Sequence, residues 1–288
     1  MYLPPFEYVR PADVTEALDI LADRGDDASV YMGGTELLLL MKLGLAAPGC
    51  LVDCKRIDGL ADIGVNGGWL TIGSAVTHRQ VEISTTIRQL VPELTNLTAG
   101  IGNVRVRAAG TLGGNLCFAD PHSDPATLLI ALGAVLHVAA ADGRRDVDCA
   151  EFAVGPYETV LEVGELLVGL SIPLPAQDTA IAYERIGFRE RPILNVAIAR
   201  IGAEFRVVVA GGGRRARRLA EVESGLARVA AGQQVIEYGV ESVATELRDL
   251  AQLTAESLDP AEDLDGSAAY KRQLMRVAFR RAVVRAFG

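Results

Sequence analysis

Two pairs of adjacent glycines, each flanked by polar residues, have the residue types and spacing best suited to chemistry in this sequence. Gly33-Gly34 precedes Thr35, and Gly113-Gly114 lies between Thr111 and Asn115. Where a glycine turn leads into a helix, the first N–H groups have no partner in the helix, and glycine lets an oxygen atom approach them closely. Two such turns could hold one diphosphate from opposite sides. The residues alone leave this hypothesis and that of two ordinary tight turns equally open.

The better-known nucleotide and nucleophile motifs are absent. Gly100-Ile101-Gly102 has Arg105 where G-x-G-x-x-G requires its third glycine, and it follows an expected helix rather than a strand. The sequence contains neither G-x-x-x-x-G-K-[ST] nor the G-x-S-x-G elbow. The residues therefore indicate an anion or nucleotide pocket without identifying its occupant.

The cysteines and histidines do not have the spacing of a metal site. Cys50 and Cys54 bracket an expected strand, which places them roughly 13 Å apart. The three histidines, His78, His122 and His137, lack ligand spacing as well. Four scattered cysteines are also too few for a disulfide framework. We therefore expect no metal in this chain and buried, unpaired thiols at Cys50, Cys54, Cys117 and Cys149.

Composition and charge narrow the class of protein. Of the 288 residues, 50% are hydrophobic and 5% aromatic, which is typical of a globular protein. A net charge of −9 argues against a nucleic-acid partner, which requires a basic surface. The basic run of residues 214–218 is better explained as a solvated turn or a subunit contact. The sequence shows no signal peptide and no apolar stretch long enough to span a membrane, so we expect a cytoplasmic protein.

Periodicity and turn residues predict an α/β start followed by a mixed region. The first segment reads as a helix ending at Gly25, a strand at 28–32, a helix at 36–43 capped by Thr35, and a strand at 50–54. The second has strands at 69–73 and 166–172, helices at 77–81, 87–99 and 125–132, and a hairpin around Asp142-Gly143. Strands at 183–188 and 205–210 precede helices from Leu219 onward, and residues 173–178 form the best domain boundary.

Residues 101–124, which read IGNVRVRAAGTLGGNLCFADPHSD, resemble the signature of one family. That family comprises the FAD-binding (medium) subunits of molybdenum hydroxylases, including aerobic carbon monoxide dehydrogenase and xanthine dehydrogenase. Residues 6–11, 33–37, 164–167 and 270–282 resemble it in the same order, so the likeness covers essentially the whole chain.

The resemblance implies an α+β architecture. A vanillyl-alcohol-oxidase (PCMH)-type FAD-binding domain would occupy residues 1–177, with lobes at about 1–56 and 57–177. A C-terminal α/β domain of the carbon monoxide dehydrogenase flavoprotein type would occupy residues 178–288. Non-covalent FAD would lie between the two N-terminal lobes.

The same resemblance implies the site residues. Two loops would bind the diphosphate, and they comprise Val30, Tyr31, Met32, Gly33, Gly34, Thr35, Glu36 and Leu37, and Thr111, Leu112, Gly113, Gly114 and Asn115. Asp124 would lie near the ribityl chain and ring, and Ile101 and Leu167 would pack against the flavin. Arg185 replaces a lysine common in the family, and Tyr183 would lie beside the ring. Leu167 could equally be a core residue and Asp124 a helix cap, and Glu36 has no clear role next to a phosphate.

The resemblance also implies a function without a catalytic residue in this chain. A large molybdopterin subunit would hydroxylate the substrate, and a small subunit with [2Fe–2S] clusters would pass electrons to FAD, in a dimer of heterotrimers. Thr35-Glu36 replaces the His-Ser of carbon monoxide dehydrogenases, which weakens an assignment to that substrate. No cysteine-rich insertion follows Cys117, so we expect no extra [4Fe–4S] cluster. The alternatives are a stand-alone flavin reductase of the same fold and a flavin-free binding module.

Overall fold

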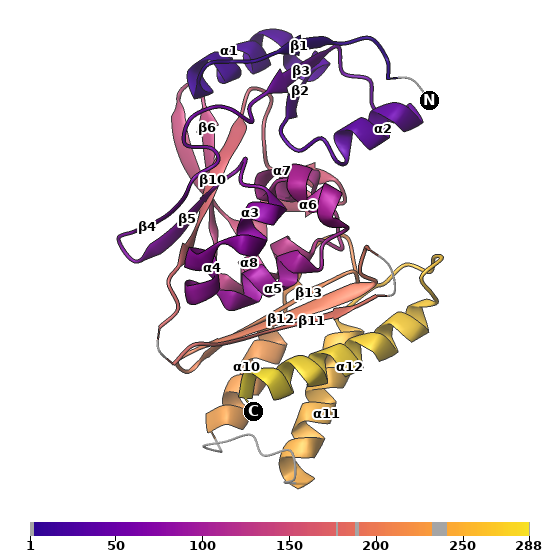
Figure 1. Ribbon diagram of the computed structural model, residues 1–288. Helices are drawn as coiled ribbons and strands as arrows, with labels where there is room; N and C mark the ends of the chain where they lie inside the picture. The colour runs from indigo at the N-terminus through magenta and orange to yellow at the C-terminus, as the bar shows by residue number, and fades with distance from the viewer. Residues whose placement is uncertain (1–2, 177, 188–189, 232–240, 288) are drawn as a thin grey trace.

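The chain is described by a computed structural model that covers residues 3–176, 178–187, 190–231 and 241–287, with only the backbone for 241–244. Its elements form three tiers (Figure 1): a small parallel sheet, a central antiparallel sheet with a group of helices, and a C-terminal sheet covered by further helices. Two earlier expectations, Phe188 at the end of a strand and the boundary at residue 177, lie outside the described residues.

The first tier is a parallel sheet of order β1-β3-β2. Its elements are β1 (Glu7–Val9), α1 (Val14–Arg24), a 3₁₀ turn (Gly25–Asp27), β2 (Ala28–Tyr31), α2 (Leu37–Leu43) and β3 (Cys50–Asp53). Helix α1 begins at Asp13, whose side chain accepts a hydrogen bond from the Glu16 N–H, and it buries Ala17, Leu18 and Leu21. The predicted αβαβ order is confirmed, and β1, which was not predicted, precedes it.

The second tier is an antiparallel sheet of order β4-β5-β10-β6-β7. Its strands are β4 (Ile63–Asn66), β5 (Trp69–Gly73), β6 (Val135–Ala140), β7 (Gly143–Asp148) and β10 (Leu166–Pro173). Strand β10 is buried along nearly its whole length because its residues pack into two different hydrophobic cores. Leu166 and Val168 pack with the first tier, whereas Leu167 and Leu170 pack with the helices. This strand therefore joins the two lobes.

Six helices lie between the central and C-terminal sheets: α3 (His78–Ile83), α4 (Thr85–Leu90), α5 (Pro92–Ala99), α6 (Val104–Ala109), α7 (Leu112–Phe118) and α8 (Asp124–Leu132). The single helix predicted at 87–99 is wrong, because the chain leaves helical geometry at Val91 (φ −142°, ψ 68°) and restarts at Pro92. Proline lacks an N–H and fits the first turn of a helix, not its interior. Short α9 (Cys149–Phe152), β8 (Ala153–Gly155) and β9 (Glu158–Thr159) follow β7.

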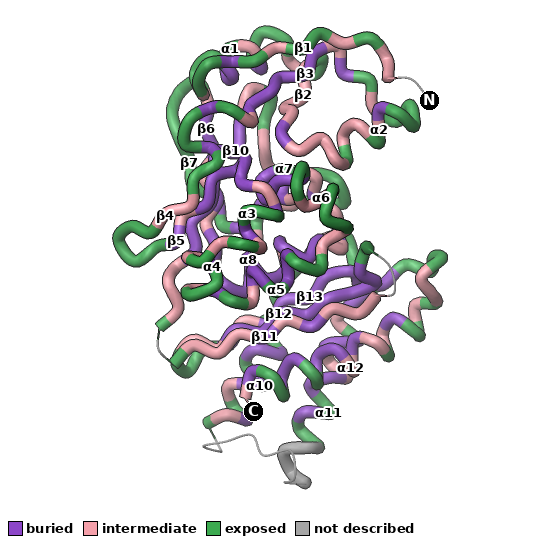
Figure 2. The backbone as a smooth tube through the Cα atoms, viewed as in Figure 1, coloured by how far each residue is buried: buried purple, intermediate pink, exposed green. Residues whose placement is uncertain are grey.

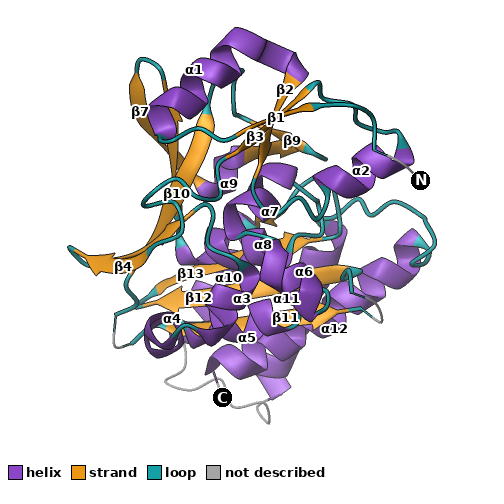
Figure 3. Ribbon diagram, turned by 45° about the horizontal axis from the view of Figure 1, so that its top comes forward, coloured by secondary structure: helices purple, strands orange, loops and turns teal. Residues whose placement is uncertain are grey.

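The third tier is an antiparallel sheet of order β11-β12-β13-β14, and helices lie on both of its faces (Figure 3). It comprises β11 (Ala180–Ile186), β12 (Leu194–Ile201), β13 (Glu204–Ala210) and β14 (Arg217–Arg218), followed by α10 (Ala220–Ala231), α11 (Glu241–Glu256) and α12 (Ala268–Phe287). Ala197 and Ala199 face the core shared with α8, whereas Val196 and Ile198 face the C-terminal helices. The buried strands form the centre of the molecule (Figure 2).

Two further predictions concern the basic run at residues 214–218 and the absence of a membrane-spanning helix. In the basic run 214–218, Arg215 donates to the carbonyls of Ala150 (3.0 Å) and Ala153 (2.8 Å), so this arginine joins two tiers and is not simply a solvated side chain. No helix in the described part of the chain is long and apolar enough to cross a membrane.

Candidate functional site

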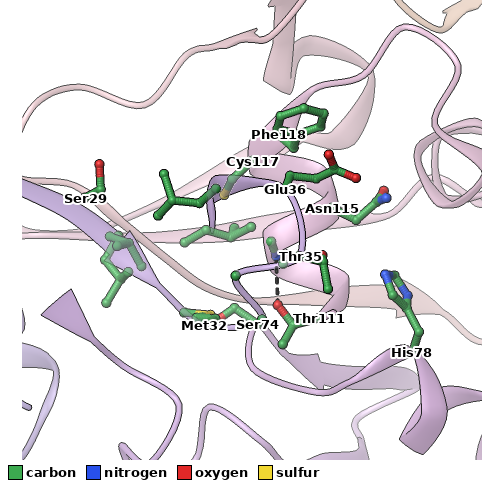
Figure 4. Close-up of a pocket in the computed structure, with 18 of the residues that line it drawn as sticks. Ser29, Met32, Thr35, Glu36, Ser74, His78, Thr111, Asn115, Cys117 and Phe118 are labelled. Carbon is green, nitrogen blue, oxygen red and sulfur yellow. Dashed lines mark hydrogen bonds between the residues drawn. The ribbon is translucent and has the colours of Figure 1, made fainter. Parts of the chain in front are cut away.

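A cavity of about 320 Å³ lies where the β2–α2 loop meets the start of α7. Its volume is at the lower end of the range for small-molecule sites, about 300–1,000 Å³. Most of the residues singled out in the sequence line it: Val30, Met32, Gly33, Gly34, Thr35, Glu36, Leu37, Ile101, Thr111, Gly113, Gly114, Asn115 and Leu167. Figure 4 shows several of these side chains around the opening. The fold thus brings the two glycine pairs, about 80 residues apart in the chain, to one cavity.

Gly33 explains how the two loops approach each other. A Cβ atom on this residue would lie 2.6 Å from the Ala109 carbonyl oxygen and 2.7 Å from the Gly110 Cα. These distances are shorter than real Cβ contacts, and both neighbours are backbone atoms. A side chain at Gly33 would therefore push the two loops apart.

The first loop leaves its backbone donors free. Gly34 adopts φ +66°, and among the hydrogen bonds of the described residues none uses the N–H of Gly33, Gly34, Thr35 or Glu36. The expectation that Thr35 caps α2 is wrong, because Glu36 holds the cap position and no side chain bonds there. Four consecutive unpaired N–H groups in the loop that leads into α2 form a site suited to an anion.

The second loop is different. Gly113 and Gly114 lie inside the first turn of α7, which follows helix α6 rather than a strand, and Thr111 caps it. The donors are already used: Leu112 N–H binds Val76 O (2.9 Å), Gly113 N–H binds Ser74 O (3.1 Å) and Gly114 N–H binds the Thr111 hydroxyl (3.0 Å). The expectation that both turns present free N–H groups is therefore wrong for this one.

The second loop instead provides a surface that a ligand can approach closely, together with a side-chain donor. Gly114 is exposed, and among the described residues Thr111 Oγ1 is the only heavy atom outside the neighbouring residues and the backbone of α7 that lies within 4 Å of a Cβ built on it. Asn115 accepts a hydrogen bond from the Ser123 hydroxyl on its Oδ1 (2.6 Å), which leaves its NH₂ group for the cavity. Gly113 instead packs on Ser74, where a Cβ would lie 2.6 Å from that residue's Cβ.

Apolar and sulfur-containing side chains complete the walls. Leu167 is both a core residue, 2% exposed, and part of the lining, so the two alternatives for it are not exclusive. The expected burial is confirmed for Cys50, Cys54 and Cys149 but is wrong for Cys117, which is exposed on the cavity wall beside Phe118. Helix α7 turns this thiol outward because its buried face carries Leu112 and Leu116.

Two acids line the cavity, and neither lysine nor arginine occurs among its described lining residues. The Glu165 carboxylate is paired with Arg145 through two contacts of 2.7 Å, which hold its pKa below the usual value. Glu36 lies near Phe118 and Asn115 (Figure 4), and partial desolvation and then the charge of Asp120 raise its pKa. Glu36 is an exposed residue that lines the cavity, and its neighbours do not explain its role.

Five of the singled-out residues lie outside the lining. Leu112 is fully buried in the core, and Tyr31 packs beneath Gly34, with the Lys55 ammonium 3.8 Å from its ring centroid. The other three contact one another: the Tyr183 hydroxyl donates to Asp124, and the Arg185 Nε lies 3.4 Å from the same carboxylate. Their predicted proximity to a flavin stays a prediction.

The Asp124 cluster is nevertheless connected to the cavity. Asp124 is the first residue of α8, and the cap is Ser123, whose hydroxyl also donates to Asn115. Burial raises the pKa of Asp124 despite the opposing effects of Tyr183 and Arg185. The Asn195 amide lies 3.5 Å from this carboxylate and donates to the His122 carbonyl at 3.1 Å. A polar network thus extends from the second loop to the C-terminal sheet.

Comparison with known proteins identifies this arrangement. The family described as the FAD binding domain in molybdopterin dehydrogenase matches residues 4–175, which include both loops and the whole cavity lining. The chain belongs to this family.

Relatives and solved structures agree over nearly the full chain. The carbon monoxide dehydrogenase medium chain of Afipia carboxidovorans is 31% identical over 98% of this chain and 96% of its own length. The 6-hydroxypseudooxynicotine dehydrogenase complex subunit alpha of Paenarthrobacter nicotinovorans is 30% identical, with coverage of 98% and 95%. A chain of quinoline 2-oxidoreductase from Pseudomonas putida 86 superposes with a TM-score of 0.89 at 29% identity, covering 99% and 98%. The chain is therefore a medium-subunit type of FAD-binding protein of the molybdenum hydroxylases.

The cavity of this family member fits FAD on structural grounds. Its first loop provides unpaired N–H groups for a diphosphate, Gly114 allows close approach, and apolar walls suit a planar ring. Four polar residues of the lining, Ser29, Ser74, His78 and Glu165, were not expected from the sequence. Thr77 gave a capping signal for α3, but nothing in the local pattern showed that its neighbours would face the second loop.

Proposed function

We propose that this chain binds FAD non-covalently between its two N-terminal lobes and transfers electrons within a three-subunit molybdenum hydroxylase. The observation that carries the proposal is the cavity itself. One lobe contributes four free N–H groups at residues 33–36, and the other contributes the glycine-rich start of α7. The membership of the chain in an FAD-binding family makes a flavin dinucleotide the natural occupant.

In this proposal the chain's residues bind and orient. The 33–36 amides hold the diphosphate, and Ile101 and Leu167 pack against the flavin. Asp124 follows Ser123, which bonds to Asn115, and it is contacted by Tyr183 and Arg185. In this proposal Asp124, Tyr183 and Arg185 fix the ribityl and ring end. Bound FAD supplies a carrier that can accept electrons one at a time and release them as a pair.

The partners follow from the division of labour. Among the described residues no group of His, Cys, Asp and Glu could hold a metal ion. We propose that a large subunit holds the molybdopterin and a small one holds the [2Fe–2S] clusters, in a dimer of heterotrimers in the cytoplasm. The words "medium chain" and "complex subunit alpha" in the names of relatives support a multi-subunit enzyme. We also propose the division into domains 1–177 and 178–288, with β10 ending at Pro173 and β11 beginning at Ala180.

Two measurements test the proposal. The purified chain should show flavin absorption and release FAD, and a colourless preparation that takes up no added FAD would refute FAD binding. Expressed with its neighbouring genes, the chain should co-elute with a large and a small subunit. Elution alone, together with reduction of a substrate by the isolated flavoprotein, would favour the stand-alone flavin reductase instead.

A further inference from the structure

Residues 74–78, which comprise the link between β5 and α3 and the first residue of α3, run antiparallel along the second glycine loop. His78 N–H donates to Gly110 O (2.9 Å), Thr77 forms a bridge with Thr111, Leu112 N–H donates to Val76 O, and Gly113 N–H donates to Ser74 O. This pairing takes up the N–H groups of Leu112 and Gly113, while the Gly114 N–H bonds to the Thr111 hydroxyl. It also places Ser74 and His78 at the two ends of the paired stretch, and both residues line the cavity.

Both side chains are buried and carry an unpaired polar atom. Ser74 is 1% exposed and His78 is 3% exposed, and neither Ser74 Oγ nor His78 Nδ1 has a hydrogen-bond partner. A buried polar group without a partner costs about 1–3 kcal/mol. Such a cost at two residues of one cavity points to a ligand that supplies the missing partners.

The position of His78 indicates which part of a bound ligand these side chains would contact. A Cβ on Gly110 would lie 3.2 Å from His78 Cδ2 and 3.3 Å from Thr35 Oγ1, so the imidazole lies at the junction of the two loops. Figure 4 shows His78 on the same side of the cavity as Thr35 and Asn115. Burial, and then the charge of Arg107, lower the pKa of His78 to about 4, so its ring is neutral at physiological pH and donates from one nitrogen.

We infer that Ser74 and His78 donate hydrogen bonds to the diphosphate oxygens of the bound dinucleotide and replace the N–H groups that the second loop uses internally. The inference rests on the proposed FAD site. The diphosphate is then held by backbone donors from the first lobe and by side-chain donors from the second.

The test uses the full chain stripped of flavin and compares Ser74→Ala and His78→Leu with the wild type. Each variant should weaken FAD binding about 13- to 160-fold, which is the effect of one lost hydrogen bond to a charged group. ADP, which carries the diphosphate without the flavin, should lose affinity by a similar factor. The flavin-free variants should melt at the same or a higher temperature, because each removes an unpaired buried polar atom.

Two controls separate this role from simple packing. His78→Gln, which keeps a donor, should recover much of the FAD affinity, and His137→Gln, on a strand away from this cavity, should leave it unchanged. Unchanged FAD dissociation constants in both Ser74→Ala and His78→Leu, or an affinity that Gln fails to recover, would overturn the inference. A wild-type chain that does not bind FAD would instead refute the proposed function.

Discussion

The two glycine loops look alike in sequence but differ in what they offer a ligand. The Gly33-Gly34 loop connects a strand to a helix and leaves four N–H groups free, whereas Gly113-Gly114 lies inside a capped helix whose donors are all used. The first loop resembles the expected anion cradle, and the second is a close-packed support. The difference teaches that a glycine pair indicates close approach, but that neighbouring chain segments decide whether its N–H groups remain available.

Gly33→Ala should have the largest effect, because it breaks the contact between the loops. The new Cβ would meet backbone atoms at 2.6–2.7 Å. We expect a loss of about 1–3 kcal/mol in the free energy of unfolding together with most of the bound flavin. Denaturant unfolding and flavin content measure both. Gly213→Ala, whose Cβ would meet nothing within 4 Å, is the control. Equal unfolding free energies and flavin contents in Gly33→Ala and Gly213→Ala would show that the loops do not need this contact.

Gly114→Val should abolish flavin retention and also lower the stability of the flavin-free protein by about 1 kcal/mol, because the new Cβ would crowd the Thr111 hydroxyl that caps α7. Its side chain would enter the space that the diphosphate occupies, and the nearest atom of the protein is Thr111 Oγ1 at 2.9 Å. The higher helix propensity of valine than of glycine offsets part of this loss of stability. Absorption spectra measure flavin retention, and thermal melting of the flavin-free protein measures stability. Full flavin occupancy in this variant would exclude Gly114 from the site.

Acid should destabilise the flavin-free protein through His78. Its pKa is about 4 in the folded state and 6.5 as a model value, so the unfolded chain takes up the proton first. The contribution of His78 to stability is therefore complete above pH 6.5 and is lost as the pH falls to 4, by up to about 3 kcal/mol. Denaturant titrations of the wild type and His78→Gln at several pH values measure it. If the unfolding free energies of the wild type and His78→Gln changed equally with pH, the burial of a neutral imidazole would be contradicted.

The smallest expected effects on stability concern Thr35, which follows the first glycine pair, and Thr111, which precedes the second. Thr111→Ala removes a helix cap and should cost about 1 kcal/mol, whereas Thr35→Ala removes none and should stay within about 0.5 kcal/mol. Chemical denaturation of the flavin-free chain is sufficient. A larger loss for Thr35→Ala than for Thr111→Ala would reverse the assignment of the two loops.

The sequence by itself determined the local elements and the identity of the family. Proline, glycine and alternating apolar residues placed β5, β10 and α8 within a residue or so, since these signals act over a few positions of the chain. The segment around Gly113-Gly114 also indicated the family, which the match over residues 4–175 confirms.

Only the tertiary structure decided which donors face the cavity. Whether the N–H of Gly113 is free depends on Ser74, 39 residues earlier in the chain (113 − 74), and the outward position of Cys117 depends on which face of α7 is buried. The role of Ser74 and His78 was equally hidden, because nothing near them in sequence shows that they pair with residues 110–113. Hydrogen bonds between distant segments leave no local pattern, and they determine what a binding loop can offer.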